Sequence, residues 1–238
     1  MYERIAAVYR DVVGDLPYRD WAAFAHDAWH GDPSPVRTVL DVCCGTGLLT
    51  AELIELGYEV TGTDGSPEMI DQARELLGPD VQLSVVVLPD LPRLGRFDAA
   101  VSTFDSLNYL TLDGLRATLA AVAAQLRPGG WFVLDLHTEH MMRTIAAAPQ
   151  SAARSGALDI AMTTHVDLGA RTSTTRVRIT PDDGPPFVEE HRQYFFAVDQ
   201  IRAAATDAGL RVVAVTDDYT SEPLDQESLR ATWVLRRA

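Results

Sequence analysis

The spacing of hydrophobic and polar positions changes twice along the chain. Within residues 1–30, apolar side chains recur every three or four positions on either side of Pro17, which predicts two helices. Between residues 37 and 137, short apolar runs alternate with segments of helical periodicity. From residue 158 the runs become strictly alternating and rich in Thr and Val. The chain therefore begins with helices, continues as alternating strands and helices, and then changes to antiparallel strands.

The middle stretch predicts a parallel sheet. Its apolar runs predict strands at residues 37–43, 58–64, 81–87, 96–104 and 131–137, and the periodic segments predict helices at 48–56, 67–77 and 112–126. Strands that alternate with helices form βαβ units, whose strands are parallel and whose crossovers are right-handed. This stretch therefore forms the core of an α/β domain.

The last part of the chain predicts an insert and the completion of the sheet. Alternating strands are expected at residues 158–167, 171–180 and 186–196, joined by turns at Gly169 and at 182–184. A helix capped by Asp199 follows, and then strands at 210–219 and 229–238. The predicted fold class is α/β, a seven-stranded, mostly parallel sheet with helices on both faces plus a small antiparallel β insert.

Composition and charge narrow the classes of partner. The 238 residues carry a formal net charge of −14, and every basic residue is Arg. Such a chain lacks the basic footprint of nucleic-acid binding and is not suited to anionic membranes. The two cysteines, Cys43 and Cys44, are adjacent and rarely pair in that arrangement. With no signal peptide expected in the N-terminal segment, these features predict a cytoplasmic protein with no membrane span.

A glycine turn after the first predicted strand carries the strongest chemical signal. In residues 39–47, VLDVCCGTG, Gly45 and Gly47 allow a ligand to approach the backbone at the carboxyl end of a strand. A dinucleotide fingerprint needs a third glycine where Thr50 stands, which argues against an NAD-dependent dehydrogenase. Asp41 suits a cationic group better than a pyrophosphate, and Asp64, at the end of the second strand, can hold both hydroxyls of a ribose.

These segments resemble the class I S-adenosylmethionine (SAM)-dependent methyltransferases. Four motifs carry the resemblance in the family's order over residues 37–137: VLDVCCGTG, VTGTDGSPEMI, FDAAVSTFDSLNYL and LRPGGWFVLDL. The opening residues and the segment HRQYFFAVDQIRAAATDAGLRVVAV resemble the branch that acts on small molecules. The resemblance implies a Rossmann-like fold and SAM as cofactor. The implied parts are an N-terminal helical lid (1–30), a SAM-binding core (31–156), an insert on the acceptor side (157–196) and a C-terminal completion of the core sheet (197–238).

The resemblance also implies roles for individual residues. Asp41 lies near the methionine amino group, Asp64 holds the ribose hydroxyls, and Met69 packs on the adenine. The implied cofactor-binding residues are Tyr9, Tyr18, Trp21, Asp41, Cys43, Gly45, Thr46, Gly47, Asp64, Gly65, Met69, Val87, Leu88, Phe104, Asp105 and Ser106. The family's usual acidic residue near the end of the third strand is absent from residues 85–89. Either backbone groups at Val87 and Leu88 or the Asp90 side chain read the adenine.

Two histidines are candidate proton acceptors. His137 follows the fifth predicted strand at the ligand edge, and His191 lies on an inserted strand that can cover the pocket. A neutral imidazole can accept a substrate proton, although both histidines can equally be hydrogen-bonded walls of the pocket. The pair His137 and His140 lacks the order of residues that binds zinc on a helix, and no metal is predicted.

The sequence thus predicts an enzyme that transfers a methyl group from SAM to a nitrogen or oxygen of a small molecule. One alternative keeps the cofactor and changes the acceptor to tRNA or protein. Another is a SAM-binding protein without catalytic activity. The predicted oligomeric state is a monomer or a homodimer, and the atom that is methylated stays open.

Overall fold

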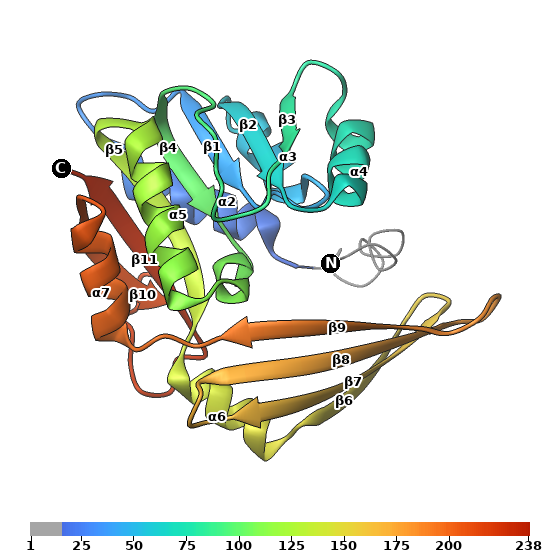
Figure 1. Cartoon of the computed structure of the whole chain (residues 1–238). Coiled ribbons are helices and arrows are strands. Elements are labelled where there is room, and N and C mark those ends of the chain that lie inside the picture. The colour runs from blue at the N-terminus through green and yellow to red at the C-terminus, as the bar shows by residue number, and fades with distance from the viewer. Residues whose placement is uncertain (1–15) are drawn as a thin grey trace.

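The computed structural model describes residues 16–238, which form two β-sheets (Figure 1). Sheet A has the order β10-β11-β5-β4-β1-β2-β3, and sheet B has the order β6-β7-β8-β9. The strands of sheet A are β1 (Thr38–Val42), β2 (Glu59–Asp64), β3 (Gln82–Val85), β4 (Phe97–Ser102), β5 (Leu126–His137), β10 (Leu210–Asp217) and β11 (Arg230–Arg237). The predicted fold class, a seven-stranded sheet with an antiparallel insert, is confirmed. Tyr9 and the first predicted helix lie outside the described residues.

Sheet A is parallel except at one edge. Strands β1 to β5 pair in parallel, whereas β11 runs antiparallel to both β5 and β10. The chain moves outward from β1 to β2 and β3 and then returns to β4 on the other side of β1. The strand order therefore reverses between β1 and β4. In open α/β sheets, ligands bind beyond the carboxyl ends of the strands at such a reversal.

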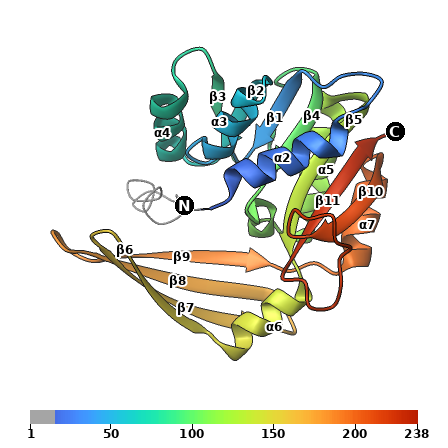
Figure 2. The same cartoon turned by 180° about the vertical axis from the view of Figure 1, so that it is seen from behind.

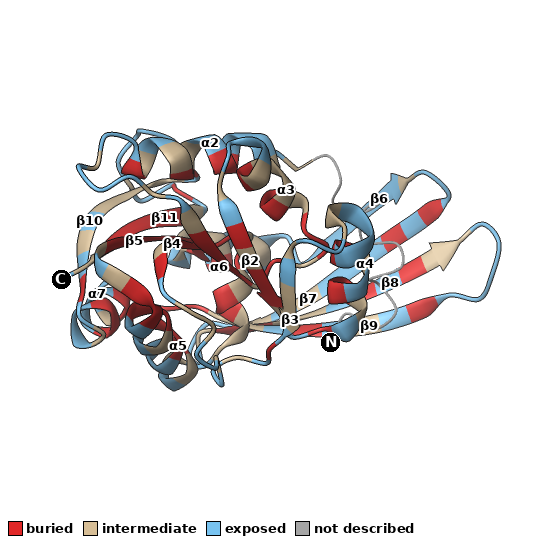
Figure 3. Cartoon of the chain, turned by 90° about the horizontal axis from the view of Figure 1, so that it is seen from above, coloured by how far each residue is buried: buried red, intermediate tan, exposed pale blue. Residues whose placement is uncertain are grey.

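Helices cover both faces of sheet A (Figures 1 and 2). They are α2 (Tyr18–Trp29), α3 (Leu48–Glu55), α4 (Pro67–Leu77), α5 (Leu112–Gln125) and α7 (Val198–Asp207). Leu115 of α5 and Ile201 of α7 pack with Phe132 in one core cluster, while Trp21 of α2 and Leu53 of α3 pack in a second cluster on the opposite face. Figure 3 shows the buried residues along the strands between these layers. The helices thus hold sheet A rigid, with the carboxyl ends of its parallel strands at one edge.

Sheet B lies below that carboxyl edge (Figure 1). Its strands are β6 (Gln150–Ser155), β7 (Leu158–Asp167), β8 (Thr172–Pro181) and β9 (Phe187–Tyr194), and all neighbouring pairs are antiparallel. Three of these strands were predicted, and β6 was not, because its sequence QSAARS has no apolar alternation and the strand is almost wholly exposed. The insert therefore has four strands and begins earlier than residue 157.

Four further elements differ from the predictions. Helix α6 (Glu139–Ala147), which begins at an N-cap hydroxyl of Thr138, and the short 3₁₀ helix η2 (Ser106–Tyr109) were not predicted. Strand β3 ends at Val85, two residues early. Asp199 does not cap α7, because the helix begins at Val198 and the side chain of Gln200 accepts the backbone N–H of Ala197.

Gly47 gives a test of the turn between β1 and α3. Its φ is +82°, and a Cβ would lie 2.8 Å from Cδ1 of Leu77 and 3.2 Å from Cβ of Ala73. Gly57 has a similar φ of +93° with nothing within 4 Å of its Cβ position. Gly57→Ala should therefore lose about 1–2 kcal/mol of unfolding free energy for the left-handed backbone alone. Gly47→Ala should lose roughly 1–3 kcal/mol more, for the overlap with α4. Urea unfolding of both variants measures the difference, and equal losses would contradict tight packing at Gly47.

Candidate functional site

The loop after β1 turns through three residues with left-handed backbone. Cys43, Gly45 and Gly47 have φ values of 63°, 55° and 82°. The turn brings the backbone N–H of Gly45 to 3.0 Å from the Asp64 carboxylate at the end of β2. A Cβ at Gly45 would meet nothing within 4 Å, so the backbone at this position borders open space. The loop therefore presents bare backbone at the point where the strand order reverses.

Asp64 is held by backbone groups. One carboxylate oxygen accepts the N–H of Gly45 and the other accepts the N–H of Ser66 at 2.9 Å. Burial raises the pKa of Asp64, and these backbone hydrogen bonds oppose that shift. An ionised carboxylate has about four acceptor positions, and with backbone hydrogen bonds from Gly45, Gly65 and Ser66 it keeps capacity for a hydroxyl donor of a ligand.

Asp41 lies deeper, one residue before the end of β1. It is 1% exposed, and one carboxylate oxygen accepts the hydroxyl of Thr50 at 2.6 Å. Burial, with a further contribution from the charge of Asp64, raises the pKa of Asp41 to about 7. A cationic group in the adjacent cleft would favour the ionised form of this carboxyl group. The two carboxylates make this end of the sheet suited to positive rather than negative ligand groups.

A narrow cleft lies between the loop after β1 and the loop after β4. The structure brings together seven of the predicted residues in its lining, namely Tyr18, Asp41, Cys43, Gly45, Thr46, Phe104 and Ser106. Its volume is about 40 Å³, well below the 300–1,000 Å³ of typical small-molecule pockets. A ligand of nucleoside size therefore needs wall side chains to move, or must extend along the carboxyl edge of the sheet.

A second group of predicted residues lies further along that edge. A Cβ at Gly65 would lie 3.7 Å from the carbonyl oxygen of Val86 and 3.9 Å from Val87, so the ends of β2 and β3 are neighbours there. Val87 is 65% exposed, and Leu88 is half-buried. Asp64 stands between this group and the cleft. Together they form a continuous edge from β4 across β1 and β2 to the end of β3.

Three further predicted residues, Trp21, Gly47 and Met69, pack behind these loops. Trp21 is buried and stacks on Phe104 and on Tyr219, at ring-centroid distances of 5.8 and 5.2 Å. Met69 is buried in α4, and Gly47 faces the same helix. Trp21 therefore supports the wall of the cleft from behind rather than facing it.

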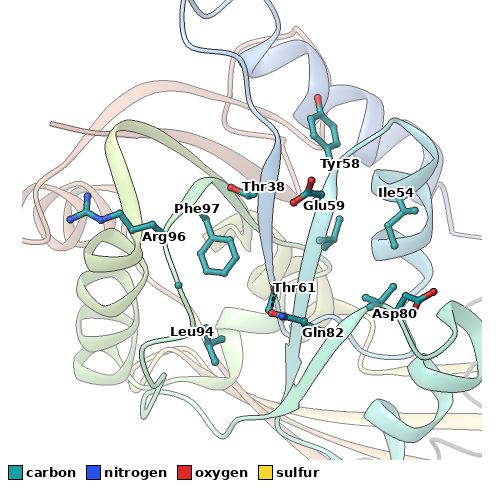
Figure 4. Close-up of a pocket in the computed structure, with 13 residues that line it drawn as sticks. Thr38, Ile54, Tyr58, Glu59, Thr61, Asp80, Gln82, Leu94, Arg96 and Phe97 are labelled. Atoms are coloured by element: carbon teal, nitrogen blue, oxygen red, sulfur yellow. Dashed lines mark hydrogen bonds between the residues drawn. The ribbon is translucent and has the colours of Figure 1, made fainter.

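A separate cavity of about 510 Å³ lies at the amino-terminal ends of strands β1 to β4, away from the cleft (Figure 4). Its labelled residues include Thr38, Glu59 and Gln82, from the beginnings of β1, β2 and β3, and Phe97 at the beginning of β4. It is larger than the cleft, but it lies away from the carboxyl ends of the strands. The cavity does not contact the glycine turn or Asp64, so it is not the cofactor site.

The loop after β4 has two consecutive residues in the left-handed region. Phe104 has a φ of 58° and Asp105 a φ of 49°, a conformation that costs free energy in residues other than glycine. The backbone N–H of Asp105 donates to Asp135 at 2.8 Å, and the side chain of Gln193 donates to Asp105 at 2.5 Å. Sheet A therefore fixes the backbone of this loop, and sheet B fixes its carboxylate.

Asp135 is the centre of a buried polar cluster that supports the loop after β4. It is fully buried, accepts the hydroxyl of Tyr219 at 2.6 Å, and lies 3.1 Å from Nε of Arg230. Burial raises the pKa of Asp135 to about 7, with Arg230 opposing the shift and Asp105 adding to it. Arg230 also pairs with Asp218 at 2.9 Å and lies 3.6 Å from Asp105.

This cluster was not predicted from the sequence. Asp135 has one visible signal, a charged residue in the middle of the buried apolar run WFVLDLH. Tyr219 and Arg230 carry no such signal. Arg230 reaches Asp135 through the pairing of β11 with β5, and Tyr219, which follows β10, through the pairing of β10 with β11, and the sequence alone gives neither register.

The two predicted histidines flank Asp105 from the two sheets. Nε2 of His137 lies 3.6 Å from Asp105, and its ring stacks on Phe195. Burial lowers the pKa of His137, and the charge of Asp105 opposes this shift. Nδ1 of His137 has no hydrogen-bond partner among residues 16–238. His191, on β9, lies 3.1 Å from the hydroxyl of Tyr109 through its Nδ1 atom.

The described residues offer neither a metal site nor a membrane-spanning helix. Within residues 16–238, no group of three or more His, Cys, Asp or Glu side chains is arranged to hold a metal ion. None of the helices described is long and apolar enough to cross a membrane.

Comparison with known proteins agrees with this geometry. A sequence model described as a methyltransferase domain matches residues 39–130. The dTDP-3-amino-3,4,6-trideoxy-alpha-D-glucopyranose N,N-dimethyltransferase of Streptomyces venezuelae is 33% identical over 207 residues, covering 82% of this chain and 85% of that protein.

Two solved structures share the fold. A SAM-dependent methyltransferase from Clostridium acetobutylicum ATCC 824 has a TM-score of 0.88 at 21% identity, covering 100% of this chain and 99% of that one. Streptomyces venezuelae DesVI has a TM-score of 0.73 at 29% identity, covering 92% and 93%. The chain belongs to the class I SAM-dependent methyltransferases. It is an enzyme whose cofactor is SAM.

Asp135→Asn tests the buried cluster through the pH dependence of stability. The pKa of Asp135 is raised from an unfolded value of about 3.9 to about 7 in the folded protein. Between these values the folded state binds more protons than the unfolded state, so this group lowers stability as pH rises from about 4 to about 7. The Asn variant lacks this effect. The unfolding free energy of the wild type minus that of the variant should therefore fall across this window.

Asp113→Asn is the matched control, because this carboxylate is 92% exposed and pairs only with Arg116 of the same helix among the described residues. Its stability should follow that of the wild type at every pH. Parallel curves for the wild type and the Asp135→Asn variant would show that Asp135 is not titrating in this window.

Proposed function

We propose that the chain transfers the methyl group of SAM to a nitrogen or oxygen of a small molecule. The observation that carries this proposal is the position of the site. Two carboxylates and a bare glycine turn stand at the reversal of strand order, and a sheet bearing His191 lies beyond the same edge. The relative from Streptomyces venezuelae is named for methylation of an amino sugar nucleotide, which supports an acceptor of modest size.

The residues at the carboxyl edge fit the cofactor. Asp64 has acceptor positions for the two ribose hydroxyls, and Gly45 offers backbone without a side chain in the way. Asp41 is buried and its pKa is about 7, so a positive methionine ammonium or sulfonium in the cleft would stabilise its ionised form. Tyr18, Cys43, Thr46, Phe104, Asp105 and Ser106 line or border the methionine side, and Gly65, Val87 and Leu88 border the adenine side. Met69, Gly47 and Trp21 support these loops from behind.

The acceptor side lies between the loop after β4 and sheet B. His137 and His191 are the proposed proton acceptors there. Both side chains are largely buried, and burial lowers the pKa of each, which favours the neutral imidazole that can accept a proton. Bound SAM supplies an activated methyl carbon for in-line displacement, so the protein contributes orientation, exclusion of water and a place for the proton. The proposed lid, residues 1–30, includes Tyr18 on the described wall of the cleft.

A product assay tests the function. The purified protein is incubated with SAM carrying a deuterated methyl group and with separate panels of small amines, small alcohols and phenols, tRNA, and proteins. Mass spectrometry should find the label on a member of the small-molecule panels. Label on tRNA or protein alone would replace the proposed acceptor class. Tight SAM binding with no transfer to any panel would favour the non-catalytic alternative.

Asp64→Ala tests the cofactor assignment. Removing two charge-assisted hydrogen bonds, each worth roughly 1.5–3 kcal/mol, should lower SAM affinity at least about tenfold. Asp64→Asn keeps one acceptor oxygen and should lose less. Asp71→Ala, which removes an exposed carboxylate paired with Arg74 on α4, is the control and should bind SAM like the wild type. Calorimetry gives the affinities, and circular dichroism checks the fold. Equal SAM affinity in Asp64→Ala and wild type would remove Asp64 from the site.

A further inference from the structure

Three polar side chains lie in a row on the face of β9 that is turned toward sheet A and the candidate site. Glu189, His191 and Gln193 are spaced every second residue, so they share one face of the strand. Gln193 donates to Asp105 of the loop after β4, which fixes this face toward sheet A. Strand β9 is also the member of sheet B that lies nearest sheet A in Figures 1 and 2. The row therefore borders the space where an acceptor must enter.

Two of these residues continue a line of polar contacts from η2. The hydroxyl of Tyr109 lies 3.1 Å from Nδ1 of His191. Nε2 of the same ring lies 3.8 Å from the carboxylate of Glu189. The side chains of His191 and Glu189 are only 9% and 13% exposed, so the line runs through a region largely shielded from water. Phenol, imidazole and carboxylate thus follow one another from sheet A into sheet B.

The outer end of the line lies beside the cofactor cleft. Ser106 lines the cleft and begins η2, and Tyr109 ends this 3₁₀ helix three residues later. Side chains at positions i and i+3 of a 3₁₀ helix project in the same direction. The Tyr109 side chain therefore stands one turn beyond Ser106 on the same side, between the cleft and His191.

We propose that Tyr109, His191 and Glu189 form a proton relay that serves an amine acceptor. This inference rests on the proposed function and assigns its substrate class. As the acceptor nitrogen forms its bond to the methyl carbon and the carbon–sulfur bond breaks, an N–H proton passes to Oη of Tyr109. The phenolic proton passes to Nδ1 of His191, and the resulting imidazolium faces the Glu189 carboxylate. The net change is one proton gained by His191.

The surrounding charges favour an amine over an alcohol. Glu189 and Asp105 place negative charge on both sides of the line, which stabilises the positive charge that develops on an amine nitrogen as it is methylated. Methylation of a neutral amine produces an ammonium group with a pKa of about 10, which is a far stronger acid than a neutral alcohol and can pass its extra proton to the relay. Burial lowers the pKa of His191, with Glu189 opposing the shift, so the ring is neutral and ready to accept a proton.

The relay requires one tautomer of His191, which can be measured without any acceptor. If Tyr109 donates to Nδ1, the ring proton of His191 lies on Nε2 and faces Glu189. Nitrogen NMR of protein labelled with ¹⁵N-histidine should show this tautomer, with the signal assigned by its loss in His191→Gln. Tyr109→Phe should shift the Nδ1 resonance toward that of a ring nitrogen without a hydrogen bond. A ring proton on Nδ1 of His191 would overturn the relay, because that ring could not receive the tyrosine proton.

The kinetic test uses full-length protein and matched variants. The probe acceptors are dTDP-3-amino-3,4,6-trideoxy-α-D-glucopyranose, its 3-hydroxy analogue, and paired amino and hydroxy sugars of simpler structure. Tyr109→Phe and Glu189→Gln should lower kcat for amine methylation by about 10²-fold or more, with the KM for SAM unchanged. Glu190→Gln is the control, because Glu190 is the next residue on β9, is 60% exposed and pairs with Arg176 on the outer face. It should keep the wild-type kcat.

The outcomes separate this inference from the function on which it rests. Methylated amines, with the loss confined to Tyr109→Phe and Glu189→Gln, support the relay. Transfer to hydroxy probes alone, an unchanged kcat in Tyr109→Phe, or SAM binding with no amine product would overturn the relay and its substrate class. Absence of SAM binding would overturn the proposed function itself.

Discussion

The site depends on two carboxylates, Asp64 and Asp135, that hold strained loops at the carboxyl edge of sheet A. Asp64 accepts the backbone N–H of Gly45 and so fixes the left-handed turn after β1. Asp135 accepts the backbone N–H of Asp105 and so fixes the left-handed turn after β4. Each turn costs free energy by itself and persists because a charged acceptor is placed by a rigid strand. The loops are therefore shaped before any ligand arrives.

The same carboxylates give the site its electrostatic character. Asp41 and Asp135 are buried enough for the pKa of each to rise to about 7, which means that their charge is costly in the free protein. Arg230 offsets part of that cost at Asp135, whereas Asp41 has a hydroxyl partner and no cation nearby among the described residues. A positively charged ligand group supplies what Asp41 lacks. Asp41 therefore belongs to the cofactor-binding end of the site, whereas Asp135, paired with Arg230, supports the loop after β4.

The sequence predicted the parts of the site that are local in the chain. The glycine turn, Asp41 and Asp64 follow from strand ends and short motifs, and the structure places them at one edge of the sheet. The tertiary contacts could not be predicted in the same way. Tyr219 and Asp135 are 84 positions apart, and Tyr109 and His191 are 82 apart. The first contact depends on the pairing of β10 with β11 and of β11 with β5, and the second depends on how sheet B packs against η2. Strand β6 was missed for another reason, because an exposed edge strand needs no apolar alternation.

Binding of SAM at this edge through preformed anionic loops can be measured by calorimetric titration. The protein is titrated with SAM, and separately with NAD, at pH 6 and at pH 8. The account predicts that SAM binds and NAD does not. It also predicts tighter SAM binding at pH 8, because Asp41, with a pKa of about 7 in the free protein, must ionise to meet the positive ligand. Binding of NAD with no response to SAM would contradict the account.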